Sequence, residues 1–324
     1  MKVLVTGGAG YIGSHTVKQL GESGKFDITV LDNLSTGFKD SVLFGKLVVG
    51  DLSDFGFVEN FLATEKFDAI IHFAASIVVP ESVTNPLKYY LNNTANTSNL
   101  IKAAVNSGVK YFVFSSTAAV YGEPKSESVT EESETFPINP YGHSKLMSER
   151  VIRDSGTAHK GFKFVILRYF NVAGASADGR IGQRFPNATH LIKVASETAC
   201  GKRDFISVFG TDYPTKDGTC IRDYIHVEDL ASAHLSALEY LDNGGESDIF
   251  NCGYGRGFSV KEVIENVKKA SGIDFKVVEG ERRAGDPSSL ISVNSKILKH
   301  LNWKPKYDNL EFICKSAYEW EKKC

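Results

Sequence analysis

The sequence predicts an α/β protein built on a doubly wound parallel sheet, with a smaller α+β domain in its second half. Short apolar segments rich in β-branched residues alternate with helical patterns through the first 172 residues. Repeated strand–helix units of this kind form parallel sheets. Glycine or polar residues directly follow several of these strands, and the ligands of such sheets bind at the carboxyl ends of the strands.

The first strand and the first helix are joined by a glycine-rich turn. An apolar segment at residues 3–6 runs into Gly8-x-Gly10-x-x-Gly13, and a helical pattern follows to about residue 21. Dinucleotide-binding folds need glycine here for a tight turn, for approach of the backbone to a pyrophosphate, and for close packing of helix on strand. The phosphates bind at the helix N-terminus, here near Tyr11. In this context the motif predicts a Rossmann-type domain.

Asp32 ends the second expected strand, residues 28–31. A carboxylate about 20 residues after the glycines accepts both adenosine ribose hydroxyls and repels a 2′-phosphate. No arginine follows within the next few residues, so the cofactor expected is NAD and not NADP. The alternative is a simple turn or helix-capping aspartate. For Asp51, which follows the strand expected at 47–50, a contact with adenine and a helix cap both stay open.

The rest of the first half continues the alternation. The unbroken apolar segment 69–74 predicts a strand that is buried on both faces. We also expect helices over 55–65, from Pro86 to about residue 107, and after Pro140, with strands over 111–115 and 163–169.

After Asn171 the pattern changes. Residues 173–187 and 212–219 read as loops. We expect helices over 191–200, 227–241, 260–270 and 308–322, and strands over 205–209 and 249–252. We therefore assign residues 1–172 to the dinucleotide-binding domain, with segments near 219–252 returning to it, and residues 173–324 to the substrate-binding domain.

Composition limits the function classes. The chain has 324 residues, a formal net charge of −2 and no basic block, which argues against nucleic acid or an anionic membrane as partner. Its five cysteines form no C-x-x-C pair, so neither a zinc site nor a disulfide framework is expected. We expect no metal, no signal peptide and no membrane span, and a cytoplasmic location.

The spacing Tyr-x-x-x-Lys occurs at three places, Tyr121/Lys125, Tyr141/Lys145 and Tyr318/Lys322. Residues i and i+4 are neighbours only on a helix. The first pair encloses glycine and proline and cannot be regular helix. The third lies in a charged C-terminal helix far from the glycine turn. The second follows Pro140, which suits a helix start, so it is the catalytic candidate.

Beside Tyr141, a lysine ammonium and a nicotinamide charge favour phenolate and lower the pKa of the phenol. The cluster Ser115-Ser116-Thr117 ends a strand just upstream and can orient a substrate hydroxyl. The sequence therefore predicts a proton-transfer site that combines Thr117, Tyr141 and Lys145.

These motifs together resemble the extended short-chain dehydrogenase/reductase family. The resemblance is carried by the glycine turn, His72-Phe73-Ala74-Ala75, Ser115-Ser116-Thr117, the Tyr141/Lys145 pair and Arg168-Tyr169-Phe170-Asn171. More narrowly, residues 137–147, 209–215, 222–227 and 283–286 are similar to the UDP-glucose 4-epimerases of that family. The resemblance spans almost the whole chain.

The resemblance implies an isomerase that inverts carbon 4 of UDP-hexoses through transient oxidation by NAD. Tyr141 would take the 4-hydroxyl proton, with Thr117 as its partner and Lys145 tuning it, and a homodimer is expected. The implied cofactor contacts are Gly7, Gly10, Tyr11, Ile12, Gly13, Asp32, Asn33, Asp51, Leu52, Phe73, Ala74, Ala75, Asn92, Ser115, Tyr141, Lys145 and Tyr169. The implied UDP-sugar contacts are Thr117, Tyr141, Asn171, Leu191, Phe209, Arg222, Arg283, Asp286 and Leu290.

The chain departs from its relatives at three positions. Ile77 replaces a lysine found near the cofactor phosphates in several relatives, which predicts weaker NAD retention unless other donors substitute. Thr117 replaces serine and keeps the hydroxyl. Leu290 replaces a bulky tyrosine, so we expect room for an N-acetyl group and activity on UDP-N-acetylhexosamines as well as UDP-galactose and UDP-glucose.

Two other functions compete. A nucleotide-sugar 4,6-dehydratase shares the fold and the first step, but it needs an acid and a base after the position of Thr117, where this chain has Ala118-Ala119. A non-catalytic NAD-binding protein is the other alternative, since fold does not fix function.

Overall fold

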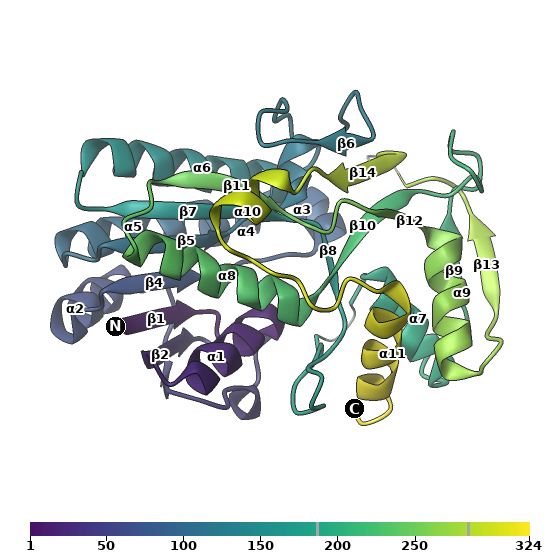
Figure 1. Ribbon diagram of the computed structural model, residues 1–324, viewed down its shortest axis with the longest axis horizontal. Coiled ribbons are helices and arrows are strands. Elements are labelled where there is room, and N and C mark those ends of the chain that lie inside the picture. Colours follow the sequence, from purple (N-terminus) through teal and green to yellow (C-terminus); the bar gives the residue numbers. More distant parts are fainter. Residues whose placement is uncertain (186–187, 284–285) are drawn as a thin grey trace.

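A parallel seven-stranded sheet forms the centre of the chain (Figure 1). The computed structural model describes residues 1–185, 188–283 and 286–324. Its strand order is β11-β7-β5-β4-β1-β2-β3, and every neighbouring pair is parallel. These strands are β1 (Lys2–Thr6), β2 (Asp27–Asp32), β3 (Lys46–Val49), β4 (Ala69–His72), β5 (Tyr111–Ser115), β7 (Lys163–Tyr169) and β11 (Asp248–Cys252). The predicted doubly wound sheet is confirmed.

Alternate residues of the central strands feed two hydrophobic cores, one on each face of the sheet. In β1, Val3 and Val5 join the core with α1 (Tyr11–Ser23) and α8 (Val227–Asp242). Leu4 between them points to the other core, with α2 (Phe55–Glu65), α5 (Asn96–Asn106) and α6 (Pro140–Ala158). Side chains of a strand alternate between faces, so apolar residues of the central strands are buried on both sides of the sheet.

The long helix expected after Pro86 is interrupted. It consists of α4 (Pro86–Tyr89), a π-helical turn η2 (Tyr90–Ala95) and α5, and the short α3 (Val79–Thr84) precedes it. The buried Asn93 lies in the π-turn, accepts a 2.8 Å hydrogen bond from Ser76 N, and donates to Ser144 Oγ at 3.0 Å. The wider turn lets Asn93 bridge the loop after β4 to α6, and such turns often mark functional sites.

The second half forms two smaller sheets and a helical layer. One sheet has the order β12-β10-β14-β6, with β8 beside β10, and the other pairs β13 with β9. Helices α7 (Leu191–Ala199), α9 (Val260–Ser271) and α11 (Leu310–Glu321) pack on one another, and α10 (Ser295–His300) lies near β11. The strands are β6 (Ser128–Val129), β8 (Asn171–Ala173), β9 (Ile206–Phe209), β10 (Ile221–His226), β12 (Gly257–Ser259), β13 (Val277–Gly280) and β14 (Ser289–Ser292).

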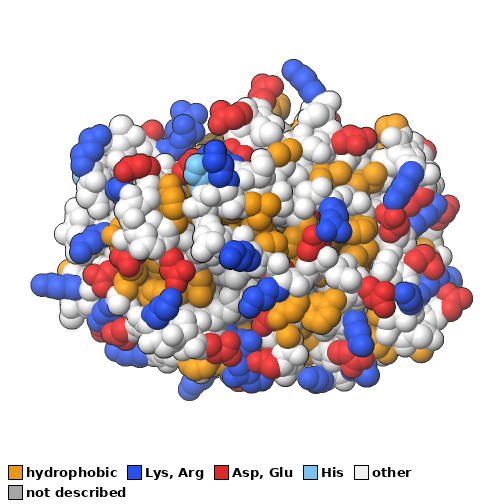
Figure 2. All heavy atoms as spheres, in the orientation of Figure 1, with side chains coloured by type: hydrophobic (Ala, Val, Ile, Leu, Met, Phe, Trp, Pro, Cys, Tyr) orange, Lys and Arg blue, Asp and Glu red, His pale blue; other side chains and the backbone are white. Residues whose placement is uncertain are grey.

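The strands β6, β10, β12 and β14 were not predicted, and β6 comes from the first half of the chain. Ser128 of β6 pairs with Ile291 of β14, far away in sequence. β6, β12 and β14 have only two to four residues and show too little periodicity to be recognised by themselves. The six residues of β10 include Arg222, Asp223 and His226, which hide an apolar pattern. Basic and acidic side chains are interspersed on the face drawn in Figure 2. Within residues 1–185, 188–283 and 286–324, no helix combines the length and apolarity that a membrane span requires.

Candidate active site

A cavity of about 1070 Å³ opens at the carboxyl ends of the central strands. Its walls come from the turn between β1 and α1, the ends of β2 to β5, the start of α6 and the segment after β7. Leu290 of β14 and Asp286 close it from the second half of the chain. Small-molecule sites commonly measure about 300–1,000 Å³, so this cavity can hold a dinucleotide together with a second ligand.

The glycine turn fits a dinucleotide. Gly7 has φ +71°, and a Cβ there would lie 2.6 Å from the backbone nitrogen of Ala74. A Cβ on Gly13 would lie 2.3 Å from Gly7 O, so helix and turn approach too closely for any side chain. Gly10 lines the cavity and is the N-cap of α1, with no side-chain cap. The first turn of α1 therefore presents its N–H groups to an anion in the cavity.

The two candidate adenosine carboxylates lie at the cavity wall. Asp32 Oδ2 accepts from Ala9 N at 3.0 Å and Oδ1 from Leu34 N at 2.8 Å. Asp32 is thus a turn residue and a cavity residue at once. Burial raises its pKa, while these two N–H groups act in the opposite direction.

Asp51 does not cap α2, because the N-cap is Asp54, which accepts from Phe57 N. Asp51 Oδ2 instead accepts a 2.7 Å bond from Asn33 Nδ2, which holds the pKa of Asp51 below its usual range. Of the two readings left open for Asp51, the helix cap is wrong. Asp51 lines the cavity, so the contact with adenine stays a prediction.

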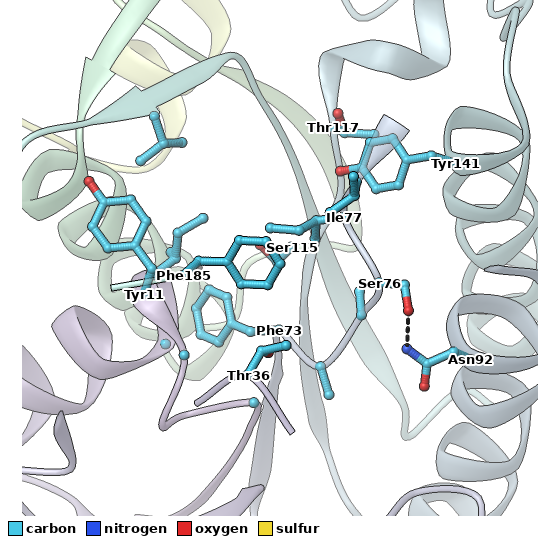
Figure 3. A pocket seen from close by; sticks show the side chains of 18 of the residues that line it. Tyr11, Thr36, Phe73, Ser76, Ile77, Asn92, Ser115, Thr117, Tyr141 and Phe185 are labelled. Carbon is cyan, nitrogen blue, oxygen red and sulfur yellow. Dashed lines mark hydrogen bonds between the residues drawn. The ribbon is translucent and has the colours of Figure 1, made fainter. Parts of the chain in front are cut away.

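The middle of the cavity is lined by the loop after β4 and by the π-turn (Figure 3). Asn92 Nδ2 donates to Ser76 Oγ at 3.0 Å, which ties the two segments together. Ile77 faces the cavity and is 37% exposed. The remaining cofactor candidates on the cavity wall are Tyr11, Ile12, Asn33, Leu52, Phe73, Ala74, Ala75, Ser115 and Tyr169.

The proton-transfer candidates converge where β5 ends and α6 begins. Tyr141 lies in the first turn of α6, which Asn139 caps by accepting from Gly142 N. Figure 3 shows Thr117 beside Tyr141, and the Thr117 hydroxyl is close enough to lower the pKa of the phenol. Lys145, one helical turn further on, is buried behind the cavity wall and donates from Nζ to the Ser115 carbonyl at 2.9 Å. The three predicted catalytic residues are therefore brought together.

The electrostatics differ in part from the expectation. Burial raises the pKa of Tyr141 and the nearby Tyr169 adds to this, while the Thr117 hydroxyl lowers it. Burial lowers the pKa of Lys145 to about 7, against a smaller upward effect of Glu149. With the protein groups alone the phenol is thus a weaker acid than usual, not a stronger one as predicted. The positive nicotinamide ring expected beside it acts in the opposite direction.

The predicted UDP contacts divide into two groups. Asn171, Arg222, Asp286 and Leu290 line the cavity. Arg222 Nη2 lies 3.7 Å from Asp286 Oδ1. Among the described residues, Arg283 and Phe209 lie off the cavity wall, with the guanidinium carbon of Arg283 only 3.7 Å from the Phe209 ring centre.

Leu191 also lies off the described cavity wall, at the start of α7, where it packs partly buried against the main hydrophobic core, so its contact with the substrate stays a prediction.

Some cavity residues were missed by the sequence reading. Phe38 and Arg184 line the cavity, and the Arg184 guanidinium carbon lies 4.0 Å from the Phe38 ring centre. Phe185 also faces the cavity, from a segment expected to be loop (Figure 3). No pattern in the sequence identifies them. Asn139 carries a signal that could have been used, since Asn before Pro predicts a helix N-cap.

The fold and site define a class: a dinucleotide-binding α/β protein with a tyrosine–lysine proton-transfer site. The model of the NAD dependent epimerase/dehydratase family matches residues 3–253. UDP-glucose 4-epimerase of Azospirillum brasilense is 51% identical over 322 residues, 99% of this chain and 92% of the relative. This chain belongs to the NAD dependent epimerase/dehydratase family.

Two solved structures of 4-epimerases are similar to this chain over its whole length. The UDP-Glc/GlcNAc 4-epimerase from Campylobacter jejuni is 60% identical, with a TM-score of 0.88 over 100% of this chain and 99% of that one. UDP-glucose 4-epimerase from Bifidobacterium longum in complex with NAD⁺ and UDP is 37% identical, with a TM-score of 0.94 over 100% and 98%.

Proposed function

We propose that this chain is an NAD-dependent UDP-hexose 4-epimerase that interconverts UDP-galactose and UDP-glucose. The observation that carries the proposal is the convergence of Tyr141, Thr117 and Lys145 at one cavity, between the glycine turn and Arg222. One end of that cavity suits a dinucleotide and the other suits a nucleoside diphosphate. The names of the relatives point to the same reaction.

Side chains of the protein transfer the proton of the sugar 4-hydroxyl and orient that hydroxyl. Tyr141 takes the proton of the sugar 4-hydroxyl, and the Thr117 hydroxyl holds that oxygen in place. Lys145 supports the phenolate from behind with its positive charge. The glycine turn and Asp32 would hold NAD, which would accept the hydride of carbon 4 and return it to the opposite face, so that the centre is inverted.

The second half of the chain holds the UDP group. Arg222 lines the cavity, and a guanidinium matches phosphate oxygens with two parallel hydrogen bonds. In the proposal, Asp286 takes a ribose hydroxyl, Asn171 a diphosphate oxygen, and Phe209 lies against uracil. Arg283 covers Phe209 in the structure, so it moves toward the diphosphate when UDP arrives.

The second substrate pair is UDP-N-acetylgalactosamine and UDP-N-acetylglucosamine. Leu290 lines the cavity among apolar neighbours, where a tyrosine would fill the space beside the sugar. The neighbour from Campylobacter jejuni is described as a UDP-Glc/GlcNAc 4-epimerase. Both observations support acceptance of the N-acetyl group.

A single assay tests the proposal. Purified protein is mixed with UDP-galactose without added NAD, and the products are separated. UDP-glucose supports the epimerase, a 4-keto-6-deoxy sugar indicates the dehydratase, and no conversion with or without added NAD indicates a binding protein. Ala118 and Ala119, in the short helical turn after Thr117, have no acidic or basic side chain, which argues against the dehydratase.

We further propose a homodimer. Val83, Leu87 and Leu91 are each more than 60% exposed on α3, α4 and the adjoining π-turn, and Met147 is exposed on α6, which packs beside that turn. A second copy is the occupant expected for this apolar surface. Light scattering of wild type and of Leu87→Glu/Leu91→Glu tests it: a monomeric variant supports the proposal, and an unchanged mass contradicts it.

The division into residues 1–172 and 173–324 stays a proposal. It is supported by the return of α8 and β11 to the central sheet. The cytoplasmic location stays a prediction from the sequence.

A further inference from the structure

Glu149 continues the helix face that carries Tyr141 and Lys145. The three residues are spaced by four along α6, so their side chains lie on one face. All three are almost fully buried, with exposures of 6%, 2% and 1% in chain order. Glu149 lies outside the described wall of the cavity, and the reaction described above gives it no part.

This helix face contacts three consecutive residues at the end of β5. Tyr141 lies beside Thr117, and Lys145 donates to the carbonyl of Ser115. The Ser116 hydroxyl donates to Glu149 Oε1 at 2.5 Å. Glu149 thus holds the middle residue of the segment whose two neighbours meet the catalytic groups.

Arg168 of β7 holds Glu149 in turn. Its Nη2 lies 2.7 Å from Oε2, and its Nε lies 3.0 Å and 3.2 Å from the two oxygens of Glu149. Both side chains are at most 4% exposed. A planar guanidinium fixes a carboxylate in two directions, so Glu149 cannot turn away from Ser116.

The same network reaches the sugar side of the cavity. Arg168 Nη1 donates to the Tyr121 hydroxyl at 3.1 Å, and that hydroxyl donates to Asn251 Oδ1 at 2.6 Å. Asn251 donates to the carbonyl of Val129 in β6, which pairs with β14, the strand of Leu290. A continuous set of hydrogen bonds therefore joins the end of β5 to the strand beside the substrate.

A purely structural role explains this arrangement less well. Buried ion pairs add little net stability, because desolvation offsets the attraction, and apolar residues can often replace them. Here the carboxylate lies one helical turn from Lys145 and favours its protonated form. The position of Glu149 therefore affects Ser116, and its negative charge affects Lys145.

We propose that Glu149, fixed by Arg168, is a positioning residue of the proposed epimerase site, which holds Ser115–Thr117 against α6 and keeps a negative charge beside Lys145. This inference rests on the proposed function for its activity readout. Other titratable or charged groups around Lys145 and Tyr141 are His72 on β4, Tyr89 on α4, and Arg168 and Tyr169 on β7.

Two holoenzyme variants separate position from charge. Ser116→Ala removes the hydrogen bond and leaves the charge, so kcat for UDP-galactose should fall about 10-fold with KM nearly unchanged and the pH profile unmoved. Glu149→Gln keeps size and an acceptor for Ser116 but removes the charge. Its kcat should fall, and the alkaline decline of activity should move down by about one pH unit. Glu149→Asp should restore the position of that decline.

A matched control lies outside the described wall of the cavity. Glu321 is 2% exposed and pairs with the buried Lys193 of α7, so Glu321→Gln removes a comparable buried charge. It should lower the melting temperature without moving the pH profile. If Glu149→Gln changes kcat and pH profile no more than Glu321→Gln does, or if Ser116→Ala retains wild-type kcat, the inference is wrong.

An NMR titration of the Lys145 side chain in the NAD complex gives a readout that is independent of turnover. A lower pKa of Lys145 in Glu149→Gln than in wild type supports the charge effect, and equal values contradict it. If wild type itself fails to convert UDP-galactose, the proposed function fails, while this comparison still decides the role of Glu149.

Discussion

The ammonium nitrogen of Lys145 lies 2.9 Å from the main-chain oxygen of Ser115 and 4.7 Å from the centre of the Phe114 ring. One charged group of α6 is thus fixed to the end of β5, directly beside Thr117. The catalytic helix and the catalytic strand end are held in register by this contact.

Removing the Tyr141 hydroxyl should remove the base. We expect Tyr141→Phe to lower kcat about 10²- to 10⁴-fold, the usual contribution of general acid–base catalysis. The measurement is steady-state conversion of UDP-galactose. Tyr318→Phe is the control, since Tyr318 has the same spacing to Lys322 but lies on α11. Comparable losses in both variants would exclude Tyr141 as the base.

The hydroxyl of Thr117, not its methyl group, should matter. Thr117→Ser keeps the acceptor for Ala119 N, a bond of 3.1 Å, and should retain kcat within a few-fold. Thr117→Val keeps the shape and loses the hydroxyl, so kcat should fall about 10- to 100-fold. Steady-state assays of both variants decide, and a Thr117→Val enzyme as active as wild type contradicts the role.

Lys145 should make stability depend on pH. Burial lowers its pKa from 10.5 to about 7, so between these values the unfolded chain binds a proton that the folded chain lacks. Stability from this group therefore rises with pH across that window, and the cost of burying the charge is greatest below pH 7.

We expect Lys145→Met to melt above wild type at pH 7, with the difference shrinking toward pH 10. Thermal unfolding at several pH values measures this. Lys102→Met, at an exposed position of α5, is the control. A difference between Lys145→Met and wild type that stays constant from pH 6 to 10 would count against a buried, pKa-shifted lysine.

Leu290 should control the choice of sugar. Leu290→Tyr places a large ring at the cavity wall, so kcat/KM for UDP-N-acetylgalactosamine should fall at least about 10-fold while UDP-galactose activity changes little. Leu290→Met conserves volume and should behave as wild type. Equal loss on both sugars would refute the gate.

Ile77 should limit NAD retention. An ammonium at this cavity position can meet the cofactor phosphates, and a charged hydrogen bond contributes about 1.5–3 kcal/mol. Ile77→Lys should therefore slow NAD release about 10-fold or more, followed by exchange into labelled NAD. Ile138→Lys, at a cavity position with the same 37% exposure, is the matched control. Faster or unchanged release in Ile77→Lys would contradict the prediction.

Local patterns in the sequence were sufficient for most of the first half of the fold. The strands and helices around the glycine turn are confirmed, because each element is long enough to show its period and each turn residue has a defined task. Gly7 and Gly13 have no room for a side chain, and the presence of glycine at these positions in the sequence already indicates this. The choice of Tyr141 over the other two tyrosine–lysine pairs also followed from local physics, since glycine and proline exclude one pair from a helix.

Tertiary structure decided what depends on distant neighbours. Burial raises the pKa of Tyr141, an effect that the motif does not reveal because burial is a property of the packed fold. Arg184 and Phe185 line the cavity, and they come from a loop that has no periodicity to predict their place. The contacts of Glu149 with Ser116 and Arg168 cross two strands and a helix. The sequence by itself therefore determined the cofactor fold and the catalytic pair, whose signals are local. Packing between remote segments decided the charge environment of that pair and the shape of the substrate end.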